Sequence, residues 1–166
     1  MKTVARYWLP PFVWMAVIWG LSTDVGSLEH TGRLFHWIAS WLVPWATPPQ
    51  IEWAHGVARK LGHLTEYAIL AGLWFRALHV GRRVGPPTSA WLALALSVAW
   101  AVLDEWHQAM VPSRAASAVD VAIDTAGATL GVLAARLGEA SSRRSRRDAR
   151  GPWDEARGAG PGRVRA

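Results

Sequence analysis

The sequence predicts an all-α protein, built as a bundle of four membrane-spanning helices. Of its 166 residues, 51% are apolar, and twelve are tryptophans. Four stretches each offer about 20 mostly apolar residues, the length that a helix needs to cross a bilayer. Basic residues collect in one loop and at the C-terminus, a distribution typical of membrane proteins. The chain has no cysteine, which excludes disulfides, thiol catalysis and cysteine-ligated metals.

The first expected span covers residues 4–23. Pro10 and Pro11 lie near its start, where a helix tolerates proline best. Lys2 and Arg6 precede the apolar run, as in a signal peptide, but no A-x-A-like cleavage site follows it. We therefore expect an uncleaved anchor.

Three further spans are expected, at 57–78, 88–108 and 117–137. The third span is the most apolar, with no ionisable residue from Trp91 to Leu103. The second and fourth spans carry charged residues and are only moderately apolar. In the fourth span, the pair Gly127 and Gly131 has the spacing of a close helix–helix contact in membranes.

Residues 33–45, "RLFHWIASWLVPW", form a different kind of segment. Trp37, Trp41 and Trp45 recur at every fourth position, which places them on one face of a helix. The segment is too short to cross a bilayer, and tryptophan favours the membrane–water boundary. We expect a short amphipathic helix on the bilayer surface; the alternative is that it packs on loops of its own domain.

Residues 138–166 form a basic tail with eight arginines and four acidic residues, rich in Gly, Pro and Ser. This composition predicts disorder, so the chain divides into a membrane domain, 1–137, and a tail, 138–166. The distribution of Lys and Arg places both termini and the 79–89 loop in the cytoplasm, for a multi-pass protein of the inner membrane. No folded nucleic-acid-binding module accompanies the tail, so we expect an anionic lipid surface as its partner and no nucleic acid.

This topology brings the unusual polar residues together at the outer face. The second, third and fourth spans each carry these polar residues, with small residues among them, as a stripe at helical spacing. The stripes are His63, Glu66 and Tyr67 on the second span, Ser97, Ala101, Asp104, Glu105 and Gln108 on the third, and Asp120, Asp124, Gly127, Ala128 and Gly131 on the fourth. Ser22, Thr23 and Asp24 close the first span on the same side. Because the acids share faces with small packing residues, they should point into the bundle. Ionisable residues inside a membrane usually mark a functional site.

At these residues the chain resembles the VanZ-like family of small bacterial membrane proteins. The block "RKLGHLTEYAILAGLWFRAL" (59–78) is similar to the family's basic-x-x-His-x-x-Glu-Tyr pattern. The block "LDEWHQAMVPSRAASAVDVAIDTAGATLG" (103–131) is similar to its Asp-Glu-x-x-Gln, Pro-x-Arg and Asp-x-x-x-Asp-x-x-Gly run. Met110 stands where an aromatic residue is expected, and Ser113 where a glycine is expected. With "WMAVIWGLST" of the first span, the resemblance covers most of residues 8–137.

The resemblance implies an inner-membrane protein with several spans. The family's namesake is linked to resistance against teicoplanin, a lipid-bearing glycopeptide that acts on cell-wall precursors outside the membrane. The resemblance supplies no reaction, and it does not by itself assign that resistance role to this chain.

The polar residues define a candidate site. The candidate catalytic set, with roles unassigned, is His63, Glu66, Asp104, Gln108, Asp120 and Asp124; Arg114 and Tyr67 are candidate substrate-binding residues. The candidate ligands for a divalent metal are His63, Glu66, Asp104, Asp120 and Asp124. Mixed His and carboxylate ligation suits Zn, Mn or Fe, and carboxylates alone suit Mg or Ca. The Arg114 guanidinium suits a bidentate contact with phosphate.

Two functions fit this set about equally. One is an enzyme that acts on a lipid-linked envelope component, a cell-wall precursor or a phospholipid headgroup. The other is a non-enzymatic binder of such a component. A third interpretation is purely structural, with Lys60 or Arg114 pairing with the acids to hold the helices together, and for Lys60 and Glu105 we favour it.

Overall fold

The computed structural model describes residues 2–23, 28–110 and 117–149, and these residues form helices and no strand. The elements in chain order are α1 (Lys2–Leu21), α2 (Leu28–Leu42), α3 (Pro48–Arg76), the short π-helix η2 (Ala77–Gly81), α4 (Pro86–Gln108) and α5 (Ala118–Asp148). The all-α class that the sequence predicts is confirmed.

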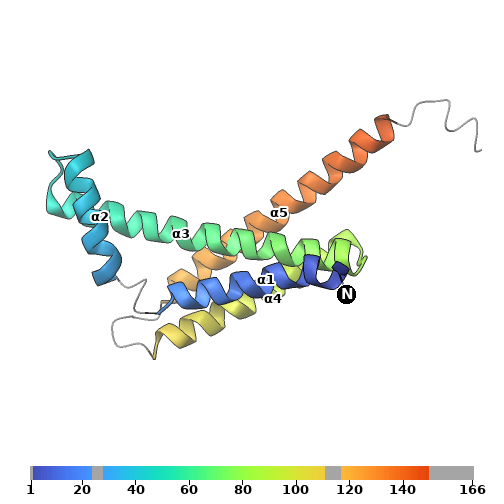
Figure 1. The fold of residues 1–166 in the computed structure, drawn as a ribbon, viewed down its shortest axis with the longest axis horizontal. Coiled ribbons are helices and arrows are strands. Elements are labelled where there is room, and N and C mark those ends of the chain that lie inside the picture. Colours follow the sequence, from blue (N-terminus) through green and yellow to red (C-terminus); the bar gives the residue numbers. More distant parts are fainter. Residues whose placement is uncertain (1, 24–27, 111–116, 150–166) are drawn as a thin grey trace, which may run out of the picture.

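The four long helices run in two opposite directions (Figure 1). α1 and α4 finish at the same end of the bundle, where α5 begins, and α3 and α5 run back from there. We call this end the polar end, defined by Ser22, His63, Asp104, Gln108 and Asp124. The opposite end is the basic end, defined by Arg6, Arg76 and Arg82, whose guanidinium groups lie over the rings of Tyr7 and Trp8.

α3 and α5 make the closest contact between helices. A Cβ atom added at Gly127 would overlap the carbonyl oxygen of Leu64, and one added at Gly131 would overlap that of Ala68. The two helices therefore touch backbone to backbone, as small residues permit in membrane bundles. The predicted contact through the glycine pair is confirmed.

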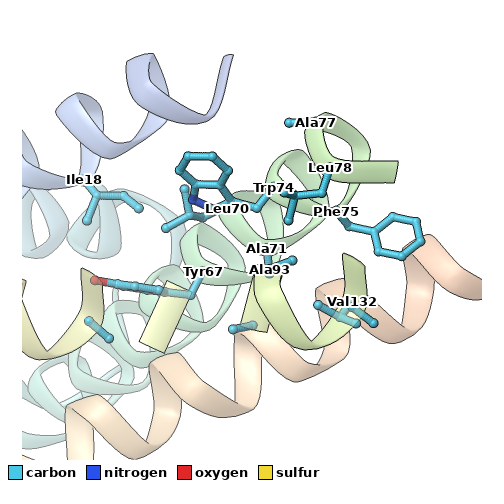
Figure 2. Close-up of a cluster of buried hydrophobic side chains, with 13 residues drawn as sticks. Ile18, Tyr67, Leu70, Ala71, Trp74, Phe75, Ala77, Leu78, Ala93 and Val132 are labelled. Atoms are coloured by element: carbon cyan, nitrogen blue, oxygen red, sulfur yellow. The ribbon is translucent and has the colours of Figure 1, made fainter. Parts of the chain in front are cut away.

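The hydrophobic core lies around α3 (Figure 2). Leu70 and Ala71 of α3 are completely buried. The Trp74 indole meets α1 edge-on, with ring centroids 6.0 Å from Trp8 and 5.3 Å from Phe12. Edge-to-face packing of this kind favours aromatic pairs beyond their buried area, so aromatic contacts hold α1 to α3.

α2 packs on the first turns of α3, to one side of the other helices (Figure 1). Phe35 of α2 lies against His55 of α3, with ring centroids 5.0 Å apart. The opposite face carries Trp37 and Trp41, which are 63% and 76% exposed, and Trp45, which is 78% exposed, lies in the turn after the helix. The expected amphipathic helix is confirmed as a helix, and its tryptophan stripe does not pack on its own domain.

The second expected span, 57–78, forms only part of α3, which begins earlier, at Pro48. Pro48 and Pro49 occupy the first turn, where the missing N–H groups of proline cost nothing. The Thr47 N–H donates to the Gln50 side-chain oxygen at 2.8 Å. These residues start the helix ahead of the apolar run.

The prediction that disorder begins at residue 138 is wrong for residues 138–148, which continue α5 and which we call the α5 extension. Glu139 lies in contact with His79 of η2, with 3.1 Å between Oε1 and Nε2, and pairs with Arg143 one turn later. Arginine is a good helix former, and Gly and Pro are absent from residues 139–148. The rest of the expected tail, residues 150–166, lies outside the described residues.

By length and composition, α4 and α5 are the two described helices that are apolar enough to cross a membrane. α3 carries Arg59, Lys60 and His63 within its expected span, which lowers its mean hydropathy. The arrangement with four spans therefore stays a prediction.

The contact between α3 and α5 predicts that Gly131→Ala destabilises the protein. The added methyl group must push the helices apart, at a cost of about 1–3 kcal/mol in the free energy of unfolding, measured in mixed detergent micelles. Gly138→Ala is the matched control, because a Cβ there meets nothing within 4 Å. It should stabilise α5 by roughly 0.5–1 kcal/mol through helix propensity. Equal effects of the two substitutions would contradict this account of the contact.

Candidate functional site

The polar stripe of α4 points into the bundle, as predicted. Its members are all buried: Ser97, Ala101, Asp104, Glu105 and Gln108. Asp104 is 1% exposed and Gln108 is 0% exposed. A carboxylate removed from solvent to this extent needs hydrogen-bond donors or a compensating charge.

Asp104 obtains its donors from α4 itself and from the end of α1. The Ser22 hydroxyl donates to Asp104 Oδ2 at 2.7 Å, and Gln108 Nε2 donates to the same oxygen at 3.0 Å. Gln108 Nε2 also lies 3.5 Å from the Ser22 oxygen. These three side chains join α1 to α4 at the polar end.

The acids of α5 face the basic residues of α3 in one continuous register. Asp120 Oδ2 lies 3.9 Å from Arg59 Nη2, and Asp124 Oδ1 lies 3.3 Å from His63 Nδ1. Asp124 is fully buried, whereas the other three side chains keep some exposure. The His63–Asp124 contact has the distance of an ion pair but lacks hydrogen-bond geometry.

Tyr67 lies between these two groups of acids. It follows His63 by one turn of α3 and is 0% exposed. Figure 2 shows its ring extending from α3 with the hydroxyl oxygen at the tip. The phenol is within electrostatic reach of both Asp104 and Asp124, and its hydroxyl has no hydrogen-bond partner among the described residues.

Several buried oxygens at the polar end lack a hydrogen-bond partner among the described residues. Among the described residues, no hydrogen-bond partner exists for Oδ1 of Asp104, Oε1 of Glu105, Oε1 of Gln108 or either oxygen of Asp124. The Tyr67 hydroxyl and His63 Nδ1 are buried donors in the same region that are also without a partner. Leaving a buried polar group unpaired costs about 1–3 kcal/mol, and more when it is charged. This part of the bundle is therefore suited to receive donors from a bound group.

The candidate Glu66, and Glu105, for which a structural role is expected, are held differently. The main-chain oxygen of Glu66 accepts a hydrogen bond from Trp14 Nε1 at 2.9 Å, and its side chain is half-buried. Glu105 Oε2 accepts the N–H of Ser117 at 2.7 Å, at the start of α5. Glu105 thus satisfies a free N–H at a helix start, which agrees with the structural role expected for it.

The structure adds Ser22 and Arg59, which were not in the candidate set. Ser22 follows directly after α1. Its contact with Asp104 could not be predicted because the two residues lie far apart in the sequence. Arg59 lies one turn before His63 and Asp120 one turn before Asp124, a matched spacing that could have revealed the pairing. Arg114 lies outside the described residues.

The candidate metal ligands do not gather around one point. In the described part of the chain, no three His, Asp or Glu side chains are placed to hold a metal ion together. Of the candidates, His63 and Asp124 meet, while Asp120 faces Arg59.

The fold and the site define a helical protein with apolar, membrane-length helices and a buried polar cluster at one end. The family model of VanZ/LLP1 matches residues 7–139. The chain belongs to this family, whose members are membrane proteins. A search of curated proteins and one of solved structures returned no match.

The hydrogen bonds of Asp104 predict that Ser22→Ala weakens the packing of α1 on α4. Loss of the 2.7 Å bond should lower the free energy of unfolding by about 1–3 kcal/mol, because the acceptor is a buried carboxylate. Ser40→Ala is the control, since that exposed hydroxyl bonds only within α2. In an Asp104→Asn background the cost of Ser22→Ala should shrink, and an unchanged cost would show that the two side chains are not coupled.

Proposed function

We propose that the chain crosses the inner membrane four times, through α1, α3, α4 and α5, with both termini in the cytoplasm. The alternating directions of the four helices support this topology. Arg6, Arg76 and Arg82 lie at the basic end, where the α5 extension also leaves the bundle. The positive-inside rule assigns that end to the cytoplasm, so the polar end faces outward.

We propose that the polar end binds or modifies the polar headgroup of a lipid-linked component of the cell envelope, in a role linked to glycopeptide resistance of the teicoplanin type. The observation that carries this proposal is the set of buried oxygens on Asp104, Gln108 and Asp124 that have no hydrogen-bond partner among the described residues. A headgroup with hydroxyl or amino donors would satisfy them. Membrane helices seldom bear such residues unless they serve a function.

A purely structural role explains the cluster less well. Buried ion pairs often contribute no net stability, because desolvation offsets their attraction. Asp124 lies one turn before Gly127, with Oδ1 3.3 Å from His63 Nδ1, yet by geometry neither of its oxygens has a hydrogen-bond partner among the described residues. A network selected to hold helices together would use its oxygens fully.

The side-chain exposure and the partners of each residue indicate its role in the proposed site. His63 retains 12% side-chain exposure beside a fully buried Asp124, which suits a base or acid oriented by a carboxylate. Asp104, Gln108 and Tyr67 suit hydrogen bonding of the headgroup. Arg114 follows this cluster in the sequence and suits a phosphate. The exposed tryptophan stripe of α2 would rest on the outer bilayer surface beside the site.

The topology predicts the location of reporter fusions. Alkaline phosphatase, which is active only outside the cytoplasm, should be active when fused after Ser113 and inactive when fused after Ala149. A fluorescent protein that folds only in the cytoplasm should give the opposite pattern. A cytoplasmic signal from the Ser113 fusion would reverse the assignment of the polar end and remove this function.

The proposed function predicts a change in envelope lipids or wall precursors that depends on the polar end. Mass spectrometry of lipids and precursors, from cells with and without the protein, should reveal an altered headgroup. If His63 and Asp124 perform acid–base catalysis, Asp124→Asn should reduce the altered species by about a hundredfold or more.

Asp148→Asn in the exposed α5 extension is the matched control and should leave that species unchanged. Protein levels in the membrane must be equal for all variants. If glycopeptide sensitivity depends on Asp124 while no lipid or precursor changes, the polar end is a binding site and not an active site. If neither responds to Asp124→Asn, the structural interpretation replaces the proposal.

A further inference from the structure

A groove lies between α4 and α5, in the half of the bundle that contains the basic end. Among the residues that line it are Ala90 and Trp91 of α4, and Thr129, Val132, Leu133 and Arg136 of α5. Its volume is about 170 Å³, which is smaller than a site that encloses a whole small molecule and suits part of one hydrocarbon chain.

The groove is largely apolar and open on one side. Its floor is formed by Ala90 and Val132, each 7% exposed, whereas Trp91 and Leu133 at its rim are 72% and 49% exposed. α4 and α5 are also the two described helices that are long and apolar enough to cross a membrane. In a bilayer, the open side of the groove therefore faces lipid chains.

Arg136 gives the groove a charged end. It is the one charged side chain of the lining, and it is exposed. From the rise of an α-helix, it lies about 10 Å nearer the basic end than Thr129 does. On α4, Ala90 lies only about 6 Å from the helix start at Pro86. The lining is thus charged near the start of α4 and apolar toward the middle of the helices.

The guanidinium of Arg136 has no ion pair among the residues that the structure describes. Glu139, one turn later, is the nearest acid along α5, and it is already in contact with His79 and Arg143. The Arg136 side chain is therefore available to bind an anion at the membrane surface.

We propose that this groove binds an anionic glycerophospholipid of the leaflet at the basic end, with part of one acyl chain between α4 and α5 and the phosphate on Arg136. A guanidinium can donate two parallel hydrogen bonds to a phosphate, and the apolar lining beside it matches the acyl chain. No carboxylate lines the groove to receive the ammonium group of a zwitterionic headgroup, which favours the anionic lipid. The exposed Trp91 indole suits the boundary between headgroups and chains. This lipid site is separate from the polar end and requires only that α4 and α5 cross the membrane.

Photo-crosslinking of the full chain in phosphatidylcholine proteoliposomes tests the proposed lipid site. The probe is phosphatidylglycerol with a diazirine in one acyl chain. Peptides that contain Trp91 or Leu133 should be labelled, and this labelling should saturate as the fraction of probe rises. Excess unlabelled phosphatidylglycerol should suppress the labelling, whereas the host phosphatidylcholine should not.

Arg136→Gln should lower the saturable labelling by about tenfold, as expected for the loss of one charged hydrogen-bonding partner. Arg144→Gln is the matched control and should leave the labelling unchanged, because it removes the same charge from an exposed position of α5 outside the groove. Thr129→Phe should fill the groove and lower the labelling by roughly fivefold, equivalent to one or two buried methylene groups. Ala134→Phe, at an exposed position of α5 that does not line the groove, should have no effect.

Equal labelling by a phosphatidylcholine probe, or equal effects of Arg136→Gln and Arg144→Gln, would overturn the proposal, because either result would show contact with bulk lipid and not a site. The other occupant that fits an apolar groove is a second copy of the chain. If copies that carry Leu133→Cys form a disulfide with each other that phosphatidylglycerol does not prevent, a second copy covers the groove and the lipid site is excluded.

Discussion

The contact between the backbones of α3 and α5 sets the geometry on which the site depends. Gly127 and Gly131 let α5 approach α3 until the main chains touch. The same register, continued toward the polar end, places Asp124 beside His63. A larger residue at either glycine would separate the helices and with them this buried pair. The site is therefore a consequence of two glycines that contribute no chemistry themselves.

The polar end works against the stability that this packing provides. Backbone contact and the aromatic packing around Trp74 stabilise the bundle through dispersion and buried area. The Asp124 carboxylate instead loses hydration, and neither of its oxygens has a hydrogen-bond partner among the described residues. Proteins retain such unfavourable groups at functional sites, where binding of a ligand supplies the missing interactions.

Helical periodicity was sufficient to predict the all-α class, the buried face of α4 and the contact through Gly127 and Gly131. It could not predict which side chains pair, because the relative rotation of helices depends on contacts between distant segments. Ser22 and Arg59 were missed for this reason. The helical α5 extension was missed because composition suggested disorder, whereas Glu139 is held locally by His79 and Arg143. α3 does not reach the hydropathy of a membrane span because it carries several charged residues, of which Arg59 pairs with Asp120 of α5.

We propose that the polar pair of His63 and Asp124 serves function, whereas the glycine contact holds the bundle together. The free energy of unfolding of the double variant His63→Leu/Asp124→Leu, in mixed micelles, tests this directly. Its stability should equal or exceed that of the unsubstituted protein, because apolar side chains of similar size remove the desolvation cost of both members of the buried pair. A loss of about 3 kcal/mol or more would contradict it, and would show that the polar pair holds the helices together.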